Sequence, residues 1–119
     1  MMEAGRELDA KVAEALGWSK VHCKDDEFFH GWLGESPEGQ FQLIPHFSTS
    51  WESMGVLVEE ARKKKILLRI VPETEGYTCS ARSDDDTRRL LGLHTDLACP
   101  VAASKAFLHA MDFKVLMGI

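Results

Sequence analysis

Cysteine is scarce in this chain: only Cys23, Cys79 and Cys99 occur among its 119 residues. A small secreted domain that depends on disulfides normally carries an even set of cysteines. The odd number and the unrelated spacings exclude a disulfide framework as the basis of the fold. We expect reduced thiols in a cytoplasmic protein, each packed as a small hydrophobic side chain.

Long apolar runs are missing as well, since no stretch approaches the roughly 20 apolar residues that a membrane-spanning helix needs. The first residues, MMEAGRELDAK, carry charges where a signal peptide has its apolar segment. We therefore expect neither a membrane span nor an export signal. Basic residues are also in the minority, and the net charge of −5 argues against direct binding of nucleic acid.

The composition that remains, 45% hydrophobic and 28% charged, is that of one globular domain over residues 1–119. Apolar residues recur at helical spacing in residues 5–16, which end before Gly17. A second helix is predicted from a capping box of Thr49 and Glu52 to the basic residues 62–65. A third is capped by Thr95 or Asp96 and carries Pro100 in its first turn.

Between these helices the pattern changes to that of strands. A loop from Lys20 leads into a hairpin with its turn at residues 35–39 and a returning strand at residues 41–44. Residues 66–71 predict a central or near-central strand, followed by strands at residues 77–81 and 88–94, the last of which also suits a helix. The apolar tail after Phe113 suits an added strand or a docking segment. The order predicts an α+β fold, with three helices on an antiparallel or mixed sheet of about four to five strands.

Side chains with catalytic or metal-binding chemistry do not assemble into a recognised motif. His22, Cys23 and His30 lack the paired ligands of a zinc site, and residues 84–86 lack the spacing and glycine of a calcium loop. We therefore predict no metal and no cofactor. Cys79 and Cys99 sit in apolar patterns that predict buried structural thiols, although a helix start at Cys99 would favour the thiolate.

The strand-to-helix junction at residues 45–50 is the candidate ligand site. It is rich in hydroxyls and precedes a helix whose first N–H groups are free to bind an anion, although simple capping explains the same residues. An arginine on a nearby strand would meet a phosphate there. The candidate ligand-binding residues are His46, Ser48, Thr49, Ser50, Arg69 and Arg82. Any early aromatic residue left exposed would supply a binding surface instead.

Several segments together resemble the phage ABA sandwich domain family of small phage and prophage proteins. These are the Gly-Trp after the first helix, the PHFSTSWE junction, the ILLRIV strand and the closing TDLACPVAASKAFLHAM helix. The resemblance runs over residues 7–111 and implies an α+β sandwich with no catalytic residues to carry over. The chain departs from the family pattern at residues 84–86 and 88–94.

The sequence thus predicts a non-enzymatic phage or prophage protein that acts in the host cytoplasm by binding a host protein. An inhibitor of a bacterial defence complex is the concrete version, since an acidic surface competes with nucleic acid for a basic site. The alternative is a protein that sequesters a small ligand or nucleotide at the candidate ligand site. A homodimer formed through the apolar tail is a further expectation.

Overall fold

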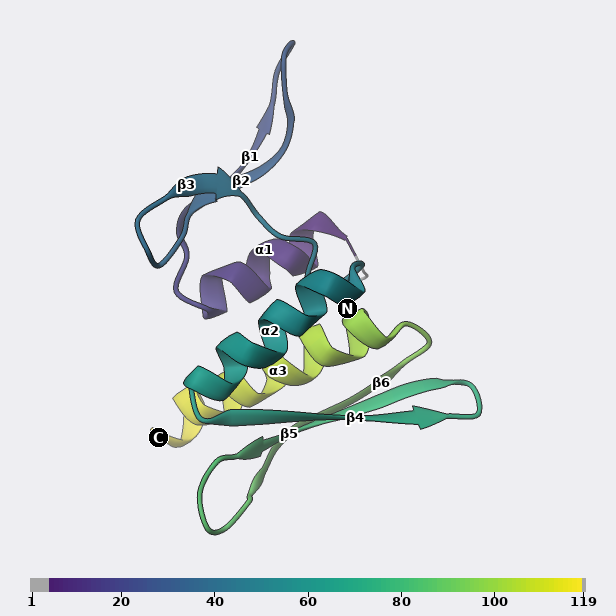
Figure 1. Ribbon diagram of the computed structural model, residues 1–119. Helices are drawn as coiled ribbons and strands as arrows, with labels where there is room; N and C mark the ends of the chain where they lie inside the picture. The colour runs from purple at the N-terminus through teal and green to yellow at the C-terminus, as the bar shows by residue number, and fades with distance from the viewer. Residues whose placement is uncertain (1–4, 119) are drawn as a thin grey trace.

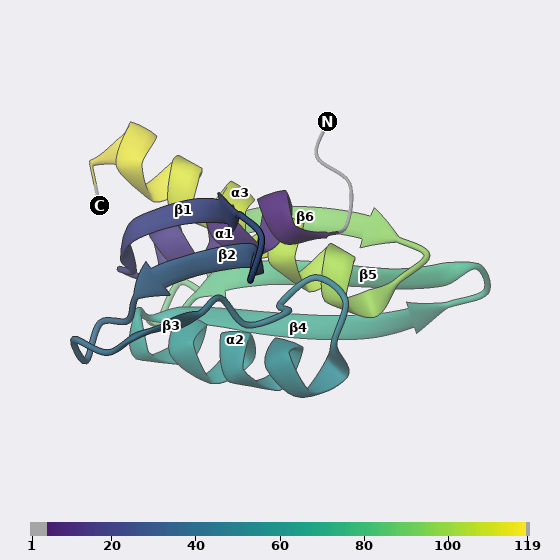
Figure 2. The ribbon, with the colours of Figure 1, turned by 90° about the horizontal axis from the view of Figure 1, so that it is seen from above.

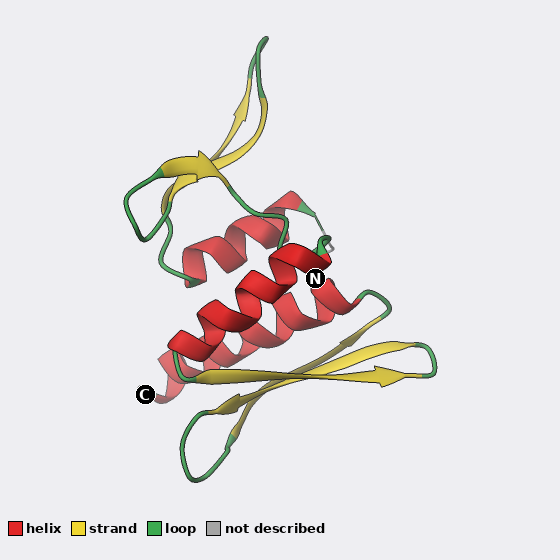
Figure 3. Ribbon diagram, viewed as in Figure 1, coloured by secondary structure: helices red, strands yellow, loops and turns green. Residues whose placement is uncertain are grey.

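A computed structural model describes residues 5–118, in which three helices and two three-stranded antiparallel sheets follow one another (Figures 1 and 3). The α+β class is therefore confirmed. The prediction of one sheet with about four to five strands is wrong, because the described chain forms six strands in two separate sheets.

The first sheet has the order β1-β2-β3, with β1 at Ser19–Asp25, β2 at His30–Glu35 and β3 at Phe41–Leu43. The hairpin predicted around residues 35–39 is confirmed as the β2–β3 connection. The loop predicted from Lys20 is wrong, because these residues form β1 and pair with β2. Most β1 side chains are exposed, so the strand lacks the apolar alternation by which a sequence reveals a half-buried strand.

The second sheet has the order β4-β5-β6, with β4 at Ile66–Glu73, β5 at Gly76–Ser83 and β6 at Leu90–Asp96. All three strands were expected, but the central or near-central position predicted for β4 is wrong. β5 occupies the centre and β4 is an edge strand that pairs with β5 alone. Pro72 lies inside β4 for this reason, since an edge strand tolerates a residue without an N–H donor.

The helices lie at Arg6–Ala15 (α1), Trp51–Lys63 (α2) and Cys99–Met117 (α3). The predicted stop after α1 is confirmed by Gly17, whose φ of 103° suits glycine. The capping box predicted for Thr49 is wrong by one residue: Ser50 caps α2, and its Oγ accepts the Ser53 N–H at 3.2 Å.

The start and end of α3 also differ from expectation. Thr95 and Asp96 belong to β6, and the N-cap of α3 is Ala98, whose N–H donates to the Asp96 carboxylate at 3.0 Å. Pro100 lies in the first turn, as predicted. The strand predicted for the tail is wrong, because α3 continues to Met117; Ile119 lies outside the described residues. None of the helices in residues 5–118 has the length and hydropathy that crossing a membrane requires.

The helices form a layer between the two sheets, as Figure 1 shows. α3 runs through the middle and contacts α1, α2 and all three strands of the second sheet. Its fully buried Phe107 packs in the same core as Leu57 of α2 and Val12 of α1. β6 lies close against α3 because Gly92 has no side chain: a Cβ there would sit 2.6 Å from the carbonyl oxygen of Ala106.

Two surfaces remain outside this packed layer. The β1–β2 hairpin projects from the body as an arm (Figure 1). α2 and α3 pack on one face of the second sheet, and in the described part of the chain no element packs on its other face. Seen from above, the last turns of α3 extend past the first sheet (Figure 2), and their Val115 and Leu116 are exposed.

Candidate functional site

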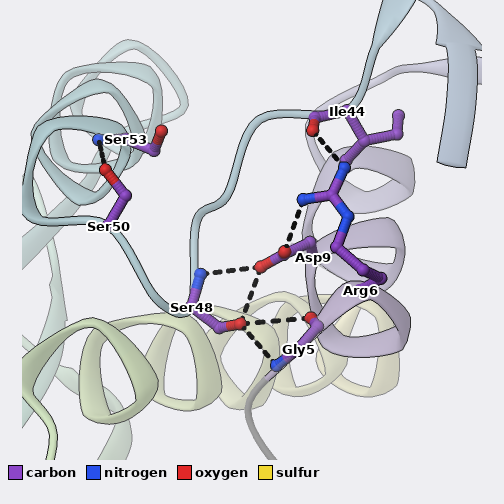
Figure 4. Close-up of polar contacts among 7 residues, drawn as sticks. All are labelled: Gly5, Arg6, Asp9, Ile44, Ser48, Ser50 and Ser53. Carbon is purple, nitrogen blue, oxygen red and sulfur yellow. Dashed lines mark hydrogen bonds and ion pairs between the residues drawn. The ribbon is translucent and has the colours of Figure 1, made fainter. Parts of the chain in front are cut away.

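The junction between β3 and α2 is tied to α1 by a buried polar cluster (Figure 4). The Ser48 N–H donates to Asp9 Oδ1 at 2.7 Å, and Ser48 Oγ lies 2.7 Å from the same oxygen. Ser48 Oγ also accepts the Gly5 N–H at 3.0 Å. Asp9 is fully buried, so its charge requires these donors. Ser48 therefore serves the fold and does not face a ligand.

Arg6 completes the charge balance of the cluster. Its Nη1 donates to Asp9 Oδ2 at 2.9 Å and its Nη2 to the carbonyl oxygen of Ile44. A guanidinium suits this position because its fixed fork of donors reaches two acceptors at once. Arg6 and Asp9 lie one turn apart on α1, while Ile44 directly precedes the junction and Ser48 lies within it. The cluster therefore fixes the path of the chain into α2.

Of the other junction residues, Ser50 caps α2, and His46 and Thr49 point their side chains into solvent. The carbonyl oxygen of His46 accepts the N–H groups of Thr49 and Ser50 at 3.3 and 2.9 Å, which makes a tight turn. The Ser50 hydroxyl is engaged as the cap of α2. The side chains of His46 and Thr49 are exposed.

The two arginines lie elsewhere. Arg69 of β4 pairs with Ser80 of β5, and Arg82 points to the same side two residues further along β5. This is the side of the sheet away from α2 and α3, whereas the junction leads into α2. The structure therefore does not bring the six predicted site residues together: the arginines form one group and the junction residues another.

A depression of about 350 Å³ lies beside the junction, between the starts of α2 and α3. The rings of Trp51 and Tyr77 meet edge to face in its wall, with their centroids 5.8 Å apart. Leu97, exposed at 79%, forms another part of the wall. None of the lining residues is charged, so the depression suits an uncharged ring better than a phosphate.

The thiols of Cys79 and Cys99 lie within the core. Burial of the Cys79 thiol raises its pKa to about 12, and the neighbouring Cys99 makes a smaller contribution in the same direction. Burial also raises the pKa of Cys99, which overturns the expectation that the start of α3 favours a thiolate. Both groups are therefore protonated near neutral pH, as structural thiols are.

The other candidate groups have structural explanations too. His22 and Cys23 are neighbours on β1 and point to opposite faces of the arm. Within residues 5–118 no three histidine, cysteine or acidic side chains gather as metal ligands would. Residues 84–86 lie in the β5–β6 turn. Hydrogen bonds to the Asp85 carboxylate lower its pKa there, and the bond from the Thr87 hydroxyl has the largest effect.

Residues 25–30, here called the arm tip, comprise the turn at residues 26–29 and the paired strand ends Asp25 and His30. The Asp26 carboxylate accepts the N–H groups of Phe28 and Phe29 at 2.8 and 2.9 Å. These hydrogen bonds lower the pKa of Asp26, and the bond from Phe28 has the largest effect. The turn therefore stabilises the ionised carboxylate of Asp26. The Asp26 N–H closes the turn on the Phe29 carbonyl oxygen at 2.9 Å.

The two phenylalanines of the arm tip behave differently. The Phe29 ring lies back over Gly31, where an added Cβ would come within 3.1 Å of it. Phe28 is exposed at 91%. Asp25, Asp26 and Glu27 precede it, with Lys24 paired to Asp26 at 3.6 Å and His30 paired to Asp25. The sequence predicted a loop here, and it predicted a binding surface at any early aromatic residue that stays exposed, as Phe28 does.

Comparison with protein-family models, with curated proteins and with solved structures found no match to the chain. The family resemblance therefore stays a prediction.

Proposed function

We propose that this chain is a non-enzymatic binding protein that docks on another protein through the arm tip. The observation that carries the proposal is Phe28, which is exposed at 91% in a turn that Asp26 holds in one conformation. Enclosing a phenylalanine side chain contributes about 1.5–3 kcal/mol, and such aromatic anchors dominate many interfaces. A turn that is already ordered loses little entropy on binding.

The acidic residues of the arm tip indicate the chemistry of the partner. Asp25, Asp26 and Glu27 directly precede Phe28, and Lys24 offsets only one of their three charges. A complementary site has an apolar pocket with lysines or arginines at its rim, and the opposite charges speed and orient docking. A nucleic-acid-binding site on a protein has such a rim, so the arm tip would compete with nucleic acid for it.

The family resemblance extends the proposal to origin and place of action. A phage or prophage protein acts in the cytoplasm of its host, so the partner is a host protein. Among host proteins, a defence complex with a basic nucleic-acid-binding site matches the acidic arm tip best. Absence of catalysis is part of the proposal, and the buried, protonated thiols support it.

The test is affinity capture from a bacterial lysate with the immobilised full chain. Phe28→Ala is compared with Leu116→Ala, a truncation of a residue that is exposed at 83% at the far end of α3. We expect a partner that the wild type and the Leu116 variant retain and that the Phe28 variant loses. Expression of the wild type, but not of the Phe28 variant, should relieve restriction of phage or plasmid. Equal capture by both variants would refute docking through the arm tip.

A second candidate function, sequestration of a small ligand, is supported by the depression beside the junction. Its Trp51 and Tyr77 rings suit a planar ligand, and its uncharged lining favours a base or nucleoside over a nucleotide. Thermal unfolding with nucleosides and nucleotides tests it, because a bound ligand stabilises the native state. The hypothesis requires a shift that Trp51→Ala abolishes and that Arg69→Ala leaves intact.

The predicted homodimer also stays a proposal. The last turns of α3 carry exposed Val115 and Leu116, which a second copy would cover. Light scattering on the intact chain and on a chain cut after Met111 checks this. The proposal is supported if the intact chain is a dimer and the shortened chain is a monomer. It is refuted if the intact chain is a monomer at every concentration.

A further inference from the structure

The outer face of the second sheet is open to solvent in the described chain, and its composition is unusual for an open face. Pairing across β4, β5 and β6 defines three rows of outward side chains, here called the outer sheet face. The rows are Leu67–Arg82–Leu90, Arg69–Ser80–Leu93 and Val71–Thr78–Thr95. The bond between the hydroxyls of Thr78 and Thr95, 3.0 Å long, confirms that the last row shares one side.

The charge of the outer sheet face is opposite to that of the whole chain. The chain carries a net charge of −5, yet the nine residues include two arginines and no acidic residue. The acidic residue that β4 adds to this side, Glu73, lies at the end of the strand, four positions from Arg69, so the face keeps a net positive charge. Arg69 and Arg82 are diagonal neighbours across β4 and β5. Among the residues that the structure describes, neither forms an ion pair; Arg82 donates only to the Arg88 carbonyl oxygen. Two exposed arginines therefore face solvent side by side.

Aliphatic side chains flank these arginines on both edges of the sheet. Val71, Leu90 and Leu93 are exposed at 37%, 43% and 48%, and Leu67 is half-buried. The solvated face of an antiparallel sheet is normally polar. Exposed aliphatic side chains on both sides of two unpaired arginines favour a surface that another molecule covers.

The composition favours one class of occupant over two others. A second copy docked about a twofold axis through the centre of this face would place arginines against arginines, which is costly without counter-ions. Single-stranded nucleic acid needs aromatic rings on which bases stack, and none of the nine residues is aromatic. A protein segment with both carboxylates and aliphatic side chains satisfies the arginines and the apolar edges together.

We propose that the outer sheet face binds an acidic, amphipathic segment of a partner protein. Its carboxylates pair with Arg69 and Arg82, whose planar guanidinium groups accept a carboxylate in a two-point contact. Its aliphatic side chains cover Leu90, Leu93 and Val71. The proposal does not rest on the arm tip, which presents the opposite charge on a different sheet.

The test uses two synthetic helical peptides with the same leucine stripe, one flanked by glutamates and the other by lysines. Amide chemical shifts of the full chain are followed by NMR during titration. We expect the glutamate peptide to shift β4, β5 and β6 signals and the lysine peptide to leave them unchanged. The Arg69→Glu/Arg82→Glu variant should bind at least tenfold more weakly, and Phe28→Ala should bind as the wild type does.

Arg62→Glu/Lys63→Glu is the matched control, because it changes the net charge equally at the exposed end of α2. Leu93→Ala supplies a second, uncharged variant that should also weaken binding. The proposal is wrong if the glutamate peptide leaves the sheet signals unchanged, or if it binds the two charge variants equally. It is also wrong if a single-stranded oligonucleotide displaces the peptide, or if diluting the free chain shifts the same signals, since a second copy then occupies the face.

Discussion

Replacing Ser48 or Asp9 by alanine tests whether the junction is built for the fold. The Ser48 side chain makes one bond to the buried Asp9 carboxylate and accepts the Gly5 N–H. A hydrogen bond to a charged group contributes about 1.5–3 kcal/mol, so Ser48→Ala should cost about 2–3 kcal/mol. Asp9→Ala also leaves the Ser48 N–H and part of the Arg6 guanidinium without an acceptor, and should cost about 3–4 kcal/mol.

Urea unfolding measures these losses, and thermal unfolding gives a second readout of roughly 3–5 °C per kcal/mol for a chain of this size. The double variant should lose less stability than the sum of the two single losses, because both changes remove the bond between Ser48 and Asp9. Glu14→Ala on the exposed side of α1 is the control and should stay within about 0.5 kcal/mol of the wild type. If both cluster variants also fell within that range, Ser48 would not be structural and the reasoning would be refuted.

Two further predictions concern packing and thiol chemistry. Gly92→Ala should destabilise the protein by about 1–3 kcal/mol, because its Cβ would meet the α3 backbone, whereas Gly55→Ala in open space on α2 should stabilise it by about 0.5–1 kcal/mol. Thermal unfolding of the two variants checks this, and equal effects would contradict the close contact of β6 with α3. In the native protein at neutral pH, a thiol reagent should modify exposed Cys23 but neither Cys79 nor Cys99, since burial and raised pKa values keep both protonated. All three should react after unfolding, and rapid native modification of Cys99 would show that its thiol is accessible.

Local signals in the sequence predicted most elements of the fold. Gly17 marks the end of α1, and residues 35–39 have the composition of the turn that they form. β1 was missed because its side chains are exposed on the arm. The edge position of β4 was missed because strand order depends on pairings between distant residues, which periodicity does not encode.

The candidate site was harder to predict than the fold, because contacts distant in sequence decide it. The hydroxyls of residues 48–50 suggested anion binding, but Asp9 engages Ser48 from 39 positions away. The sequence predicted that an arginine on a nearby strand would reach the junction, yet Arg69 lies on the side of the sheet away from the helices, which depends on tertiary packing. The acidic and aromatic composition of the arm tip was visible, whereas its projection from the body was not.

The most direct test of the central claim is the affinity of the captured partner for the wild type and for Phe28→Ala, measured by calorimetry. Loss of the phenyl anchor should weaken binding by roughly 10- to 100-fold, or about 1.4–2.8 kcal/mol. The wild-type affinity should also fall as salt rises, because the acidic arm tip meets a basic rim. Unchanged affinity in Phe28→Ala, with Leu116→Ala equal to the wild type, would contradict docking through the arm tip.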